Sequence, residues 1–582
     1  MPIIMNSKPS PVIFAMILLL ALLCKGASTD AGCVESERNA LVDFKRGLLD
    51  HTGRLSSWTG SDCCNWRGVA CSNRTGHVVR LDLRNPHPFS RTDDPPCNKW
   101  SMGGELRPSL LGLKNLRYLD LSMNYFGGRP IPEFIGSIRN LRYLNLSQAG
   151  LGGLVPRQVG NLSSLQYLDL YNDLDYRFSG RDPEFSIDDP LWISGLSSLR
   201  HLDMGYVKFR DTSSLVESLN MLPHIVVVRL SRCEIQSIPL SLPHVNFTRL
   251  STLDLSYNRI NSPTIPSWLF NVSSLVHLDL GSNDFRGSIP AEIENLSSLE
   301  VLRLSGNLNL QGVIPKEVGN ICKLHTLGLT EINISRSLPE LGDVFSGCIK
   351  TSLENLDLFG TGLTSYLPDW LGELTSLKTL ILGGNSLVGS LPESLGRLTS
   401  LQELSLYGNK LNGTVPAEIL GGLVELVYLD LSKNLLEGII SEAHLANLTK
   451  LSHLDLSSNR LALEFSPNWV PLFRLDSLDV SSCNLGKKFP SWIRNQANIS
   501  RLFMANAGIE DAMPDWFWVS FVQVEKLDIS KNAIYGRLPI NFDVQLLLWF
   551  SANKFFSKRD ITRSSRQFVF RNDRSSHRRE YA

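Results

Sequence analysis

The chain has 582 residues, with 57 Lys plus Arg, 57 Asp plus Glu and a formal net charge of zero. This balance excludes the global charge that would attract nucleic acid or an anionic membrane, so we expect no nucleic-acid partner. Hydrophobic residues make up 43% of the chain, which is ordinary for a folded protein.

Residues 1–29 have the pattern of a targeting segment. Lys8 precedes an apolar run from Val12 to Cys24, and small residues follow around Ala27. The run is shorter than the roughly 20 residues that a membrane-spanning helix needs. It predicts a cleaved secretory signal peptide, with an uncleaved anchor as the alternative. The mature chain is therefore expected to be extracellular.

Residues 30–76 are predicted to form an N-terminal cap. Ala40, Leu41, Phe44 and Leu48 have the spacing of a short amphipathic helix. Four cysteines also lie here, and in a secreted chain an even cluster predicts disulfides: Cys33, Cys63, Cys64 and Cys71. Because adjacent cysteines are not expected to bond each other, two connectivities remain. We favour Cys33–Cys63 with Cys64–Cys71, and a zinc site is the alternative.

Residues 77–555 repeat one phrase, Leu-x-x-Leu-x-Leu. It reads LRYLDLSMN from Leu116, LRYLNLSQA from Leu141 and LQYLDLYND from Leu165. Its anchors are Leu116, Leu141, Leu165, Leu199, Ile225, Leu250, Leu275, Leu299, Leu324, Leu353, Leu377, Leu401, Leu426, Leu451, Leu475, Ile499 and Val524. Most steps are 24 to 26 residues, a period that predicts a leucine-rich repeat solenoid. With strands at Val78 and at 545–550, we expect about 19 repeats.

Each repeat is expected to add one short parallel strand to an α/β solenoid. The predicted shape is a leucine-rich repeat horseshoe with a concave parallel sheet, in which the leucines point inward. In phrases such as GSIPAEIENLSSL, Gly is expected to end the strand and Pro to direct the chain into short helical turns on the convex side. Two insertions, 86–100 and 173–192, are predicted to be loops.

An Asn closes the phrase in ten repeats and is expected to hydrogen-bond the neighbouring backbone. These residues are Asn124, Asn258, Asn283, Asn307, Asn385, Asn409, Asn434, Asn459, Asn532 and Asn553. Cys233 and Cys483 occupy the same position, which predicts buried single thiols. Cys322 and Cys348 precede the strands of consecutive repeats and could form a bridge. No partner for Cys97 is identified.

N-x-[ST] sequons accompany the repeats. Five fall four residues before an anchor, which predicts a glycosylated flank away from the strands; the alternative is that N-L-S-S-L is repeat consensus alone. The predicted glycosylation sites are Asn73, Asn161, Asn246, Asn271, Asn295, Asn333, Asn412, Asn447 and Asn498. Asn145 also begins a sequon but lies within a predicted strand, and we do not expect it to be modified.

No catalytic constellation stands out. The sequence contains no kinase-like HRD or DFG set, no H-E-x-x-H and no G-x-S-x-G. His201, His277 and His453 share one repeat position, and the Asp of the L-D-L phrase recurs as consensus, so we interpret these aspartates as a solvated strand face. We therefore predict no enzyme activity, no cofactor and no metal.

One row of side chains is a candidate binding surface. Tyr118, Tyr143, Tyr167 and His201 occupy the second position after consecutive anchors and should lie side by side on the concave face. The predicted ligand-binding residues are Tyr118, Asp120, Tyr143, Tyr167, Asp169, His201 and Asp203. The alternative is that each Tyr packs only against its neighbours.

The cap sequence CVESERNALVDFKRGLLD, with TGHVVRLDL after it, resembles the N-terminal domain of plant leucine-rich repeat receptor-like proteins. GSIPAEI and GSLPESL are similar to the plant-specific repeat class. MLPHIVVVRLSRCEI and NFTRLSTLDLSYNRI resemble the fungal-xylanase-receptor subgroup. The resemblance implies a kinase-less defence receptor for a protein, peptide or glycan ligand, which is single-pass in the plasma membrane and signals through partner receptor kinases.

Two features depart from this family. Residues 556–582 are basic and lack the repeat, and no terminal cap or membrane span follows. We therefore expect a C-terminally truncated receptor, with a basic tail that has its own role as the alternative. A secreted leucine-rich repeat inhibitor of microbial cell-wall-degrading enzymes is the alternative function.

Overall fold

The computed structural model describes residues 32–87, 99–173, 184–334, 336–521, 523–537, 547–549 and 553–556. Among these, no helix is long and apolar enough to cross a membrane. The predicted signal peptide, Cys97 and the basic tail lie outside the described residues. The chain divides into two units, residues 1–324 and 325–582, and each is described separately.

The N-terminal cap contains the predicted helix, α2 (Glu35–Gly47), which buries Leu41 and Phe44. Leu48 is buried too, but it begins strand β1 (Leu48–Leu49) rather than extending the helix. The helix is tied to the first repeat through Glu37, a buried carboxylate that accepts a hydrogen bond of 2.6 Å from the Val78 amide. Strand β2 (Val69–Cys71) pairs antiparallel with β3 (Val78–Asp82), so the cap covers the first edge of the sheet.

The favoured cysteine pairing is confirmed. Cys33 bonds Cys63, and Cys64 bonds Cys71, so these four thiols are not available as zinc ligands. Cys322 and Cys348 are both disulfide-bonded. Cys233 and Cys483 are buried free thiols, as predicted from their place in the repeat.

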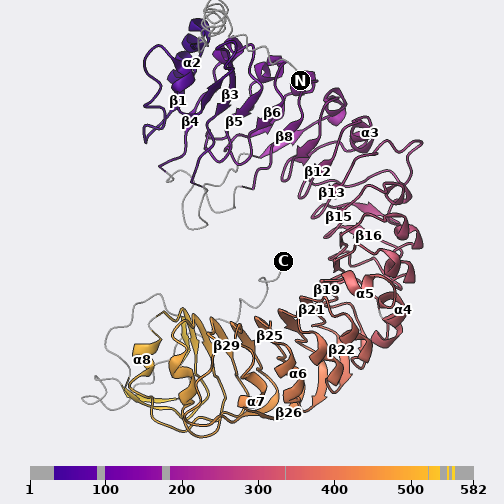
Figure 1. Ribbon diagram of the computed structural model, residues 1–582, viewed down its shortest axis with the longest axis vertical. Coiled ribbons are helices and arrows are strands. Elements are labelled where there is room, and N and C mark those ends of the chain that lie inside the picture. Colours follow the sequence, from indigo (N-terminus) through magenta and orange to yellow (C-terminus); the bar gives the residue numbers. More distant parts are fainter. Residues whose placement is uncertain are drawn as a thin grey trace, which may run out of the picture. The chain divides into compact units, whose positions relative to one another are not determined.

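A parallel sheet runs through the first unit (Figure 1). Each of its strands except β3 begins two residues after an anchor. The strands pair residue for residue from one repeat to the next. After β3 they are β5 (Tyr118–Asp120), β6 (Tyr143–Asn145), β8 (Tyr167–Asp169), β10 (His201–Asp203), β12 (Val227–Arg229), β13 (Thr252–Asp254), β15 (His277–Asp279) and β17 (Val301–Arg303).

The second unit has the same arrangement, again with parallel, residue-for-residue pairing. Its strands are β18 (Thr326–Gly328), β19 (Asn355–Asp357), β21 (Thr379–Ile381), β23 (Glu403–Ser405), β25 (Tyr428–Asp430), β27 (His453–Asp455), β29 (Ser477–Asp479), β30 (Arg501–Phe503), β31 (Lys526–Asp528) and β33 (Leu547–Trp549). We call the side of the main sheet that faces away from the leucine core in each unit the strand face.

The repeated leucines form the core of each unit. In the repeat of β5, for example, Leu116, Leu119 and Leu121 are all fully buried. Burying a leucine side chain stabilises the fold by about 1.5–3 kcal/mol. Because every repeat contributes several, the leucine phrase alone accounts for the stacking of successive turns.

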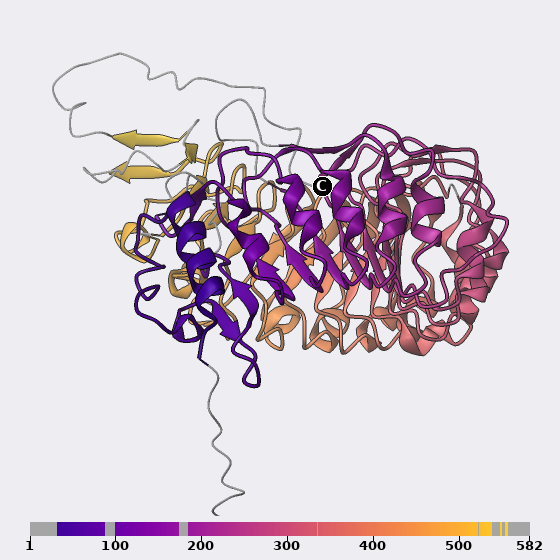
Figure 2. The ribbon, with the colours of Figure 1, turned by 90° about the horizontal axis from the view of Figure 1, so that it is seen from above.

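Short helical turns follow the prolines, as predicted. Pro132, Pro156 and Pro290 directly precede the 3-10 helices η4 (Glu133–Ser137), η5 (Arg157–Asn161) and η8 (Ala291–Asn295). These prolines are the N-cap residues and have extended backbone, a conformation that the proline ring allows. Figures 1 and 2 show that, within each unit, these turns and the strands lie on opposite sides of the repeats.

The sequons that precede anchors lie with these turns. Asn161, Asn271 and Asn295 end η5, η7 (Ser267–Asn271) and η8, and all five such asparagines are exposed. Asn145, in contrast, is 8% exposed within β6. Glycans at the exposed asparagines remain a prediction.

The second unit has a second set of short strands that the sequence did not predict, and the expectation that Gly ends the extended segment holds for two of them but not for a third. A side sheet forms there after the main strands, from β20 (Thr364–Ser365), β22 (Ser386–Gly389), β24 (Lys410–Gly413), β26 (Leu435–Ile440) and β28 (Arg460–Leu463). Gly389 and Gly413 are the last residues of β22 and β24, at φ of 83° and 77°, and Gly438 lies inside β26 at φ of 94°. Glycine permits this positive φ, so the chain can turn where β22 and β24 end, whereas the pairing of β26 with β28 continues past Gly438.

The second predicted insertion, 173–192, is not wholly a loop. Residues 174–183 lie outside the described part of the chain, but β9 (Phe185–Ile187) pairs in parallel with β7 (Gly153–Leu154) and β11 (Lys208–Phe209). Helix η6 (Pro190–Gly195) follows directly. The end of the insertion therefore has the same strand and helical turn as the other repeats.

The recurring Asn joins neighbouring repeats through the backbone, as predicted. Asn434 Nδ2 donates to the carbonyl oxygens of Leu406 in the preceding repeat and Leu431 in its own, at 2.9 and 3.1 Å. Its Oδ1 accepts from the Leu411 amide at 3.1 Å. Cys233 and Cys483 occupy this position with weaker thiol contacts to carbonyls at 3.1 Å.

We predict that Asn434→Ala lowers the free energy of unfolding by about 3 kcal/mol, because several buried backbone groups lose their partner. Asn434→Thr should lose less, since Thr361 fills the same position naturally and its hydroxyl donates to the Leu358 carbonyl. Urea unfolding followed by circular dichroism measures both. An unchanged midpoint for Asn434→Ala would contradict this role.

Candidate ligand-binding site

The predicted row of aromatic side chains is a continuous stack on the strand face of the first unit. Tyr118, Tyr143, Tyr167 and His201 face one another across paired strands, with ring centroids 4.1, 4.3 and 4.2 Å apart and interplanar angles of 7°, 11° and 9°. The strand spacing of about 4.8 Å forces this arrangement when each repeat places a ring at the same position. We call these four residues the aromatic stack.

The stack leaves ring edges and hydroxyl groups accessible, because each ring covers the face of the next. All four side chains are half-buried. The Tyr118 hydroxyl donates to Asp120 at 3.1 Å and the Tyr167 hydroxyl to Asp169 at 3.3 Å. The alternative interpretation, that each tyrosine packs against its neighbours, is thus correct for the ring faces. A ligand would contact the ring edges.

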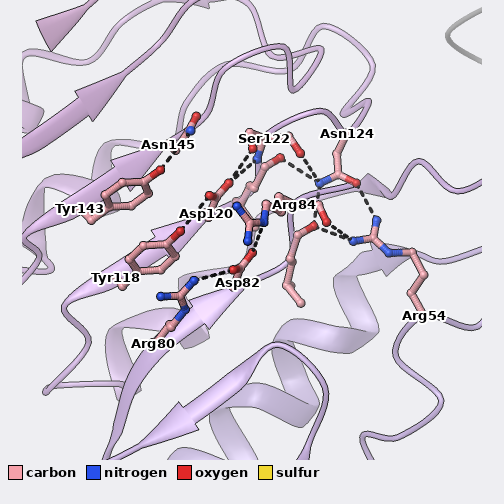
Figure 3. A network of polar contacts seen from close by, with 12 residues as sticks. Arg54, Arg80, Asp82, Arg84, Tyr118, Asp120, Ser122, Asn124, Tyr143 and Asn145 are labelled. Atoms are coloured by element: carbon pink, nitrogen blue, oxygen red, sulfur yellow. Dashed lines mark hydrogen bonds and ion pairs between the residues drawn. The ribbon is translucent and has the colours of Figure 1, made fainter. Parts of the chain in front are cut away.

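The aspartates of the L-D-L phrase are not a solvated face, which corrects our interpretation. Asp120 is only 1% exposed, and one of its oxygens accepts from the Ser122 amide at 3.0 Å and the Ser122 hydroxyl at 2.7 Å (Figure 3). Asp169 and Asp203 likewise accept from amides two residues on, at 3.0 and 3.1 Å. The turn after each strand folds over the carboxylate, so these residues brace the turn.

Burial shifts the protonation of this row. It raises the pKa of Asp169 to about 6, with a further contribution from the nearby Asp203 carboxylate. Burial, together with the Arg229 charge, lowers the pKa of His201 to about 4. Burial also raises the pKa of the Tyr118 hydroxyl above its ordinary value. At neutral pH the stack is therefore uncharged, beside carboxylates that are costly to ionise.

The sequence reasoning missed a cation at one end of the stack. The Arg80 guanidinium lies 3.8 Å from the centroid of Tyr118 and donates to Asp82 at 2.7 Å (Figure 3). Arg80 pairs with Tyr118 in register, so it occupies the same repeat position as the tyrosines. Reading this position back to the VVRLDL strand would have found it.

A second aromatic row was also missed. Tyr206, Arg232 and Tyr257 each stand seven residues after an anchor, in consecutive repeats. The Arg232 guanidinium lies 4.2 Å from the Tyr257 ring centroid and 5.5 Å from that of Tyr206. All three have positive φ, between 53° and 65°, which recurs at this turn position in other repeats. The shared position was visible in the sequence as a column of residues.

The repeats define the class of this protein. Residues 34–72 match the family model described as leucine rich repeat N-terminal domain, and residues 301–512 match the leucine-rich repeat region. Residues 115–137 and 248–308 match further leucine rich repeat models. The chain is a leucine-rich repeat protein with an N-terminal cap domain.

Its relatives narrow the family. Receptor-like protein EIX1 of Solanum lycopersicum is 38% identical over 557 residues, which cover 87% of this chain and 53% of that protein. Receptor-like protein EIX2 of the same plant is 34% identical, with 90% and 55% covered. The chain belongs to the plant leucine-rich repeat receptor-like proteins, in the EIX subgroup. It spans about half the length of these relatives.

Solved structures agree with the fold. The ectodomain of the receptor kinase GASSHO1/SCHENGEN3 from Arabidopsis thaliana, in complex with CASPARIAN STRIP INTEGRITY FACTOR 2, has a TM-score of 0.70 at 26% identity, covering 89% of this chain and 62% of that one. The PEPR1–AtPEP1 structure has a TM-score of 0.56 at 26% identity, covering 90% and 82%.

The raised pKa of Asp169 predicts that Asp169→Asn stabilises the protein at neutral pH. A carboxyl whose folded pKa is about 6 rather than 3.8 costs stability as pH rises through this window, and the cost is complete above pH 6. The variant should gain about 1–2 kcal/mol at pH 7. Asn145 shows that an amide fits, since its Oδ1 accepts from the Ser147 amide at 2.9 Å.

Asp211→Asn is the matched control with the opposite sign. Hydrogen bonds from Ser213 lower the pKa of this exposed carboxyl. Thermal unfolding between pH 4 and pH 7 measures all three proteins. If Asp169→Asn keeps the wild-type pH dependence, the burial argument for this row is wrong.

Proposed function

We propose that this chain is the extracellular ligand-recognition part of a kinase-less receptor-like protein in plant defence signalling. Its membership of the plant receptor-like proteins, 38% identical to EIX1, carries the proposal. The aromatic stack supports it, because exposed ring edges and hydroxyls beside carboxylates are typical binding anchors. In this role the chain recognises a ligand and has no catalytic step of its own.

The ligand is proposed to be a protein or peptide that lies on the strand face of the first unit. Tyr118, Tyr143, Tyr167 and His201 would contact it directly, while Asp120, Asp169 and Asp203 hold the surrounding turns. The similar ectodomain of GASSHO1/SCHENGEN3, whose structure was solved in complex with CASPARIAN STRIP INTEGRITY FACTOR 2, supports a protein or peptide ligand. Signalling at the plasma membrane would then pass through a partner receptor kinase.

We expect binding to depend on the strand face and not on the opposite side. The secreted chain is immobilised and exposed to fractionated microbial culture filtrates, and bound peptides are identified and retitrated by surface plasmon resonance. Tyr143→Ala should weaken binding at least tenfold, because it removes an anchor at the centre of the stack. Tyr143→Phe, which keeps the stacked ring, should weaken it less.

Glu292→Ala is the matched control, since Glu292 is exposed on η8, on the side opposite the strands. Circular dichroism confirms that each variant is folded. Equal binding by wild type and Tyr143→Ala would overturn the site. Inhibition of a microbial cell-wall hydrolase by the chain, with no peptide bound, would favour the secreted-inhibitor function instead.

A further inference from the structure

A cationic cavity opens where the cap meets the first repeat. Its volume is about 320 Å³, and its charged lining residues are Arg54, Arg67, Arg80, Asp82 and Arg84, which we call the arginine pocket. Arg54 and Arg67 come from the cap. Arg80 and Asp82 lie in β3, and Arg84 lies two residues after its end. Four arginines and a single carboxylate thus line the pocket.

Arg54 has a structural role in this pocket, because hydrogen bonds to the surrounding chain hold its guanidinium in place. Its two terminal nitrogens donate to the carbonyl oxygens of Trp100, Leu83 and Arg84 at 2.9, 2.9 and 2.6 Å, and to Asn124 Oδ1 at 3.0 Å (Figure 3). These bonds join the cap to the first two repeats. Because they occupy the donors of both terminal nitrogens, Arg54 supplies charge to the cavity but little hydrogen bonding.

The remaining arginines have spare donors. Arg80 and Arg84 share Asp82, at 2.7 and 3.4 Å. Within the described residues, the exposed Arg67 side chain makes no hydrogen bond or ion pair. Burial lowers the pKa of Arg54, the nearby Asp50 carboxylate raises it, and the like charge of Arg67 lowers it. Because four arginines and one aspartate line the pocket, it carries net positive charge, which would attract an anion.

The backbone keeps this cluster together. Gly68 accepts a hydrogen bond of 2.7 Å from the Asp82 amide, and its φ is +84°. A Cβ at this position would lie 2.4 Å from the Asp82 carbonyl oxygen. Only glycine permits so close an approach, which sets Arg67 next to the charged residues of β3.

We propose that the arginine pocket binds a carboxylate of a peptide ligand whose chain continues along the aromatic stack. The inference rests on the proposed ligand-binding function and names the polar group that anchors the ligand. Guanidinium forks match carboxylates in geometry and charge. Arg80 belongs to both features, since it lines the pocket and covers Tyr118, so a ligand leaving the pocket meets the stack at once.

A peptide fits this surface better than an acidic sugar. Sugars bind tyrosines through the ring faces, and here each face is covered by a neighbouring ring or by Arg80. The accessible groups are ring edges and the hydroxyls of Tyr118, Tyr143 and Tyr167. These suit the amide and carbonyl groups of an extended backbone.

The probe is a fluorescein-labelled hexaglutamate peptide, titrated with the full chain and followed by fluorescence anisotropy. We expect Arg67→Gln and Arg84→Gln each to raise its Kd about five- to tenfold. Arg139 is exposed, lies two residues after η4 and does not line the pocket. Arg139→Gln should therefore leave the Kd within twofold of the wild-type value. A hexaglutamine peptide of the same length should not bind.

Each outcome decides the inference. Equal Kd values for wild type, Arg67→Gln and Arg84→Gln overturn the pocket, as does an equal loss in Arg139→Gln, which would indicate diffuse charge attraction. Stronger binding of a galacturonate hexamer than of hexaglutamate overturns the peptide assignment. If peptides from culture filtrates need Tyr143 but neither Arg67 nor Arg84, the pocket fails while the proposed function stands.

Discussion

In-register parallel pairing is the constraint on which this structure depends. Each strand pairs with the next residue for residue, so a position in the repeat becomes a row in space. The hydrogen-bonded spacing of about 4.8 Å then decides how neighbouring side chains interact. Aromatic rings at one repeat position therefore stack on one another. Carboxylates at one repeat position repel one another unless hydrogen bonds or protonation stabilise them. A single-residue shift would move every outward side chain into the core.

Much of the fold follows from the sequence because the leucine phrase records this constraint directly. Leu119 and its equivalents up to Leu527 are buried as the phrase predicts, and the cap helix buries Leu41 and Phe44 at the expected spacing. The Asn position was also predictable, including the thiols of Cys233 and Cys483 that replace it. These features are local and periodic, and a column of identical residues is sufficient evidence for them.

Other features could not be predicted because they depend on contacts that the phrase does not encode. The side sheet uses strands of two to six residues, which are too short for any periodicity to reveal. The burial of Asp120 depends on the turn at Ser122 folding over it, although the outward register of Asp120 suggested water. The arginine pocket combines cap residues with a strand, so no single stretch of sequence contains it.

The stack also changes what the strand face can recognise. Four rings in mutual contact lose their faces as binding surfaces, and Arg80 covers the face at one end. With its pKa near 4, His201 is neutral at the other end, where the nearby Arg229 guanidinium lies 3.8 Å from the Asp203 carboxylate, so among the residues of the row itself the charge is at the Arg80 end. A partner that lies along this row therefore meets neutral edges over most of its length and cations at the cap. That polarity gives an elongated ligand a direction, which a uniform row of tyrosines would not do.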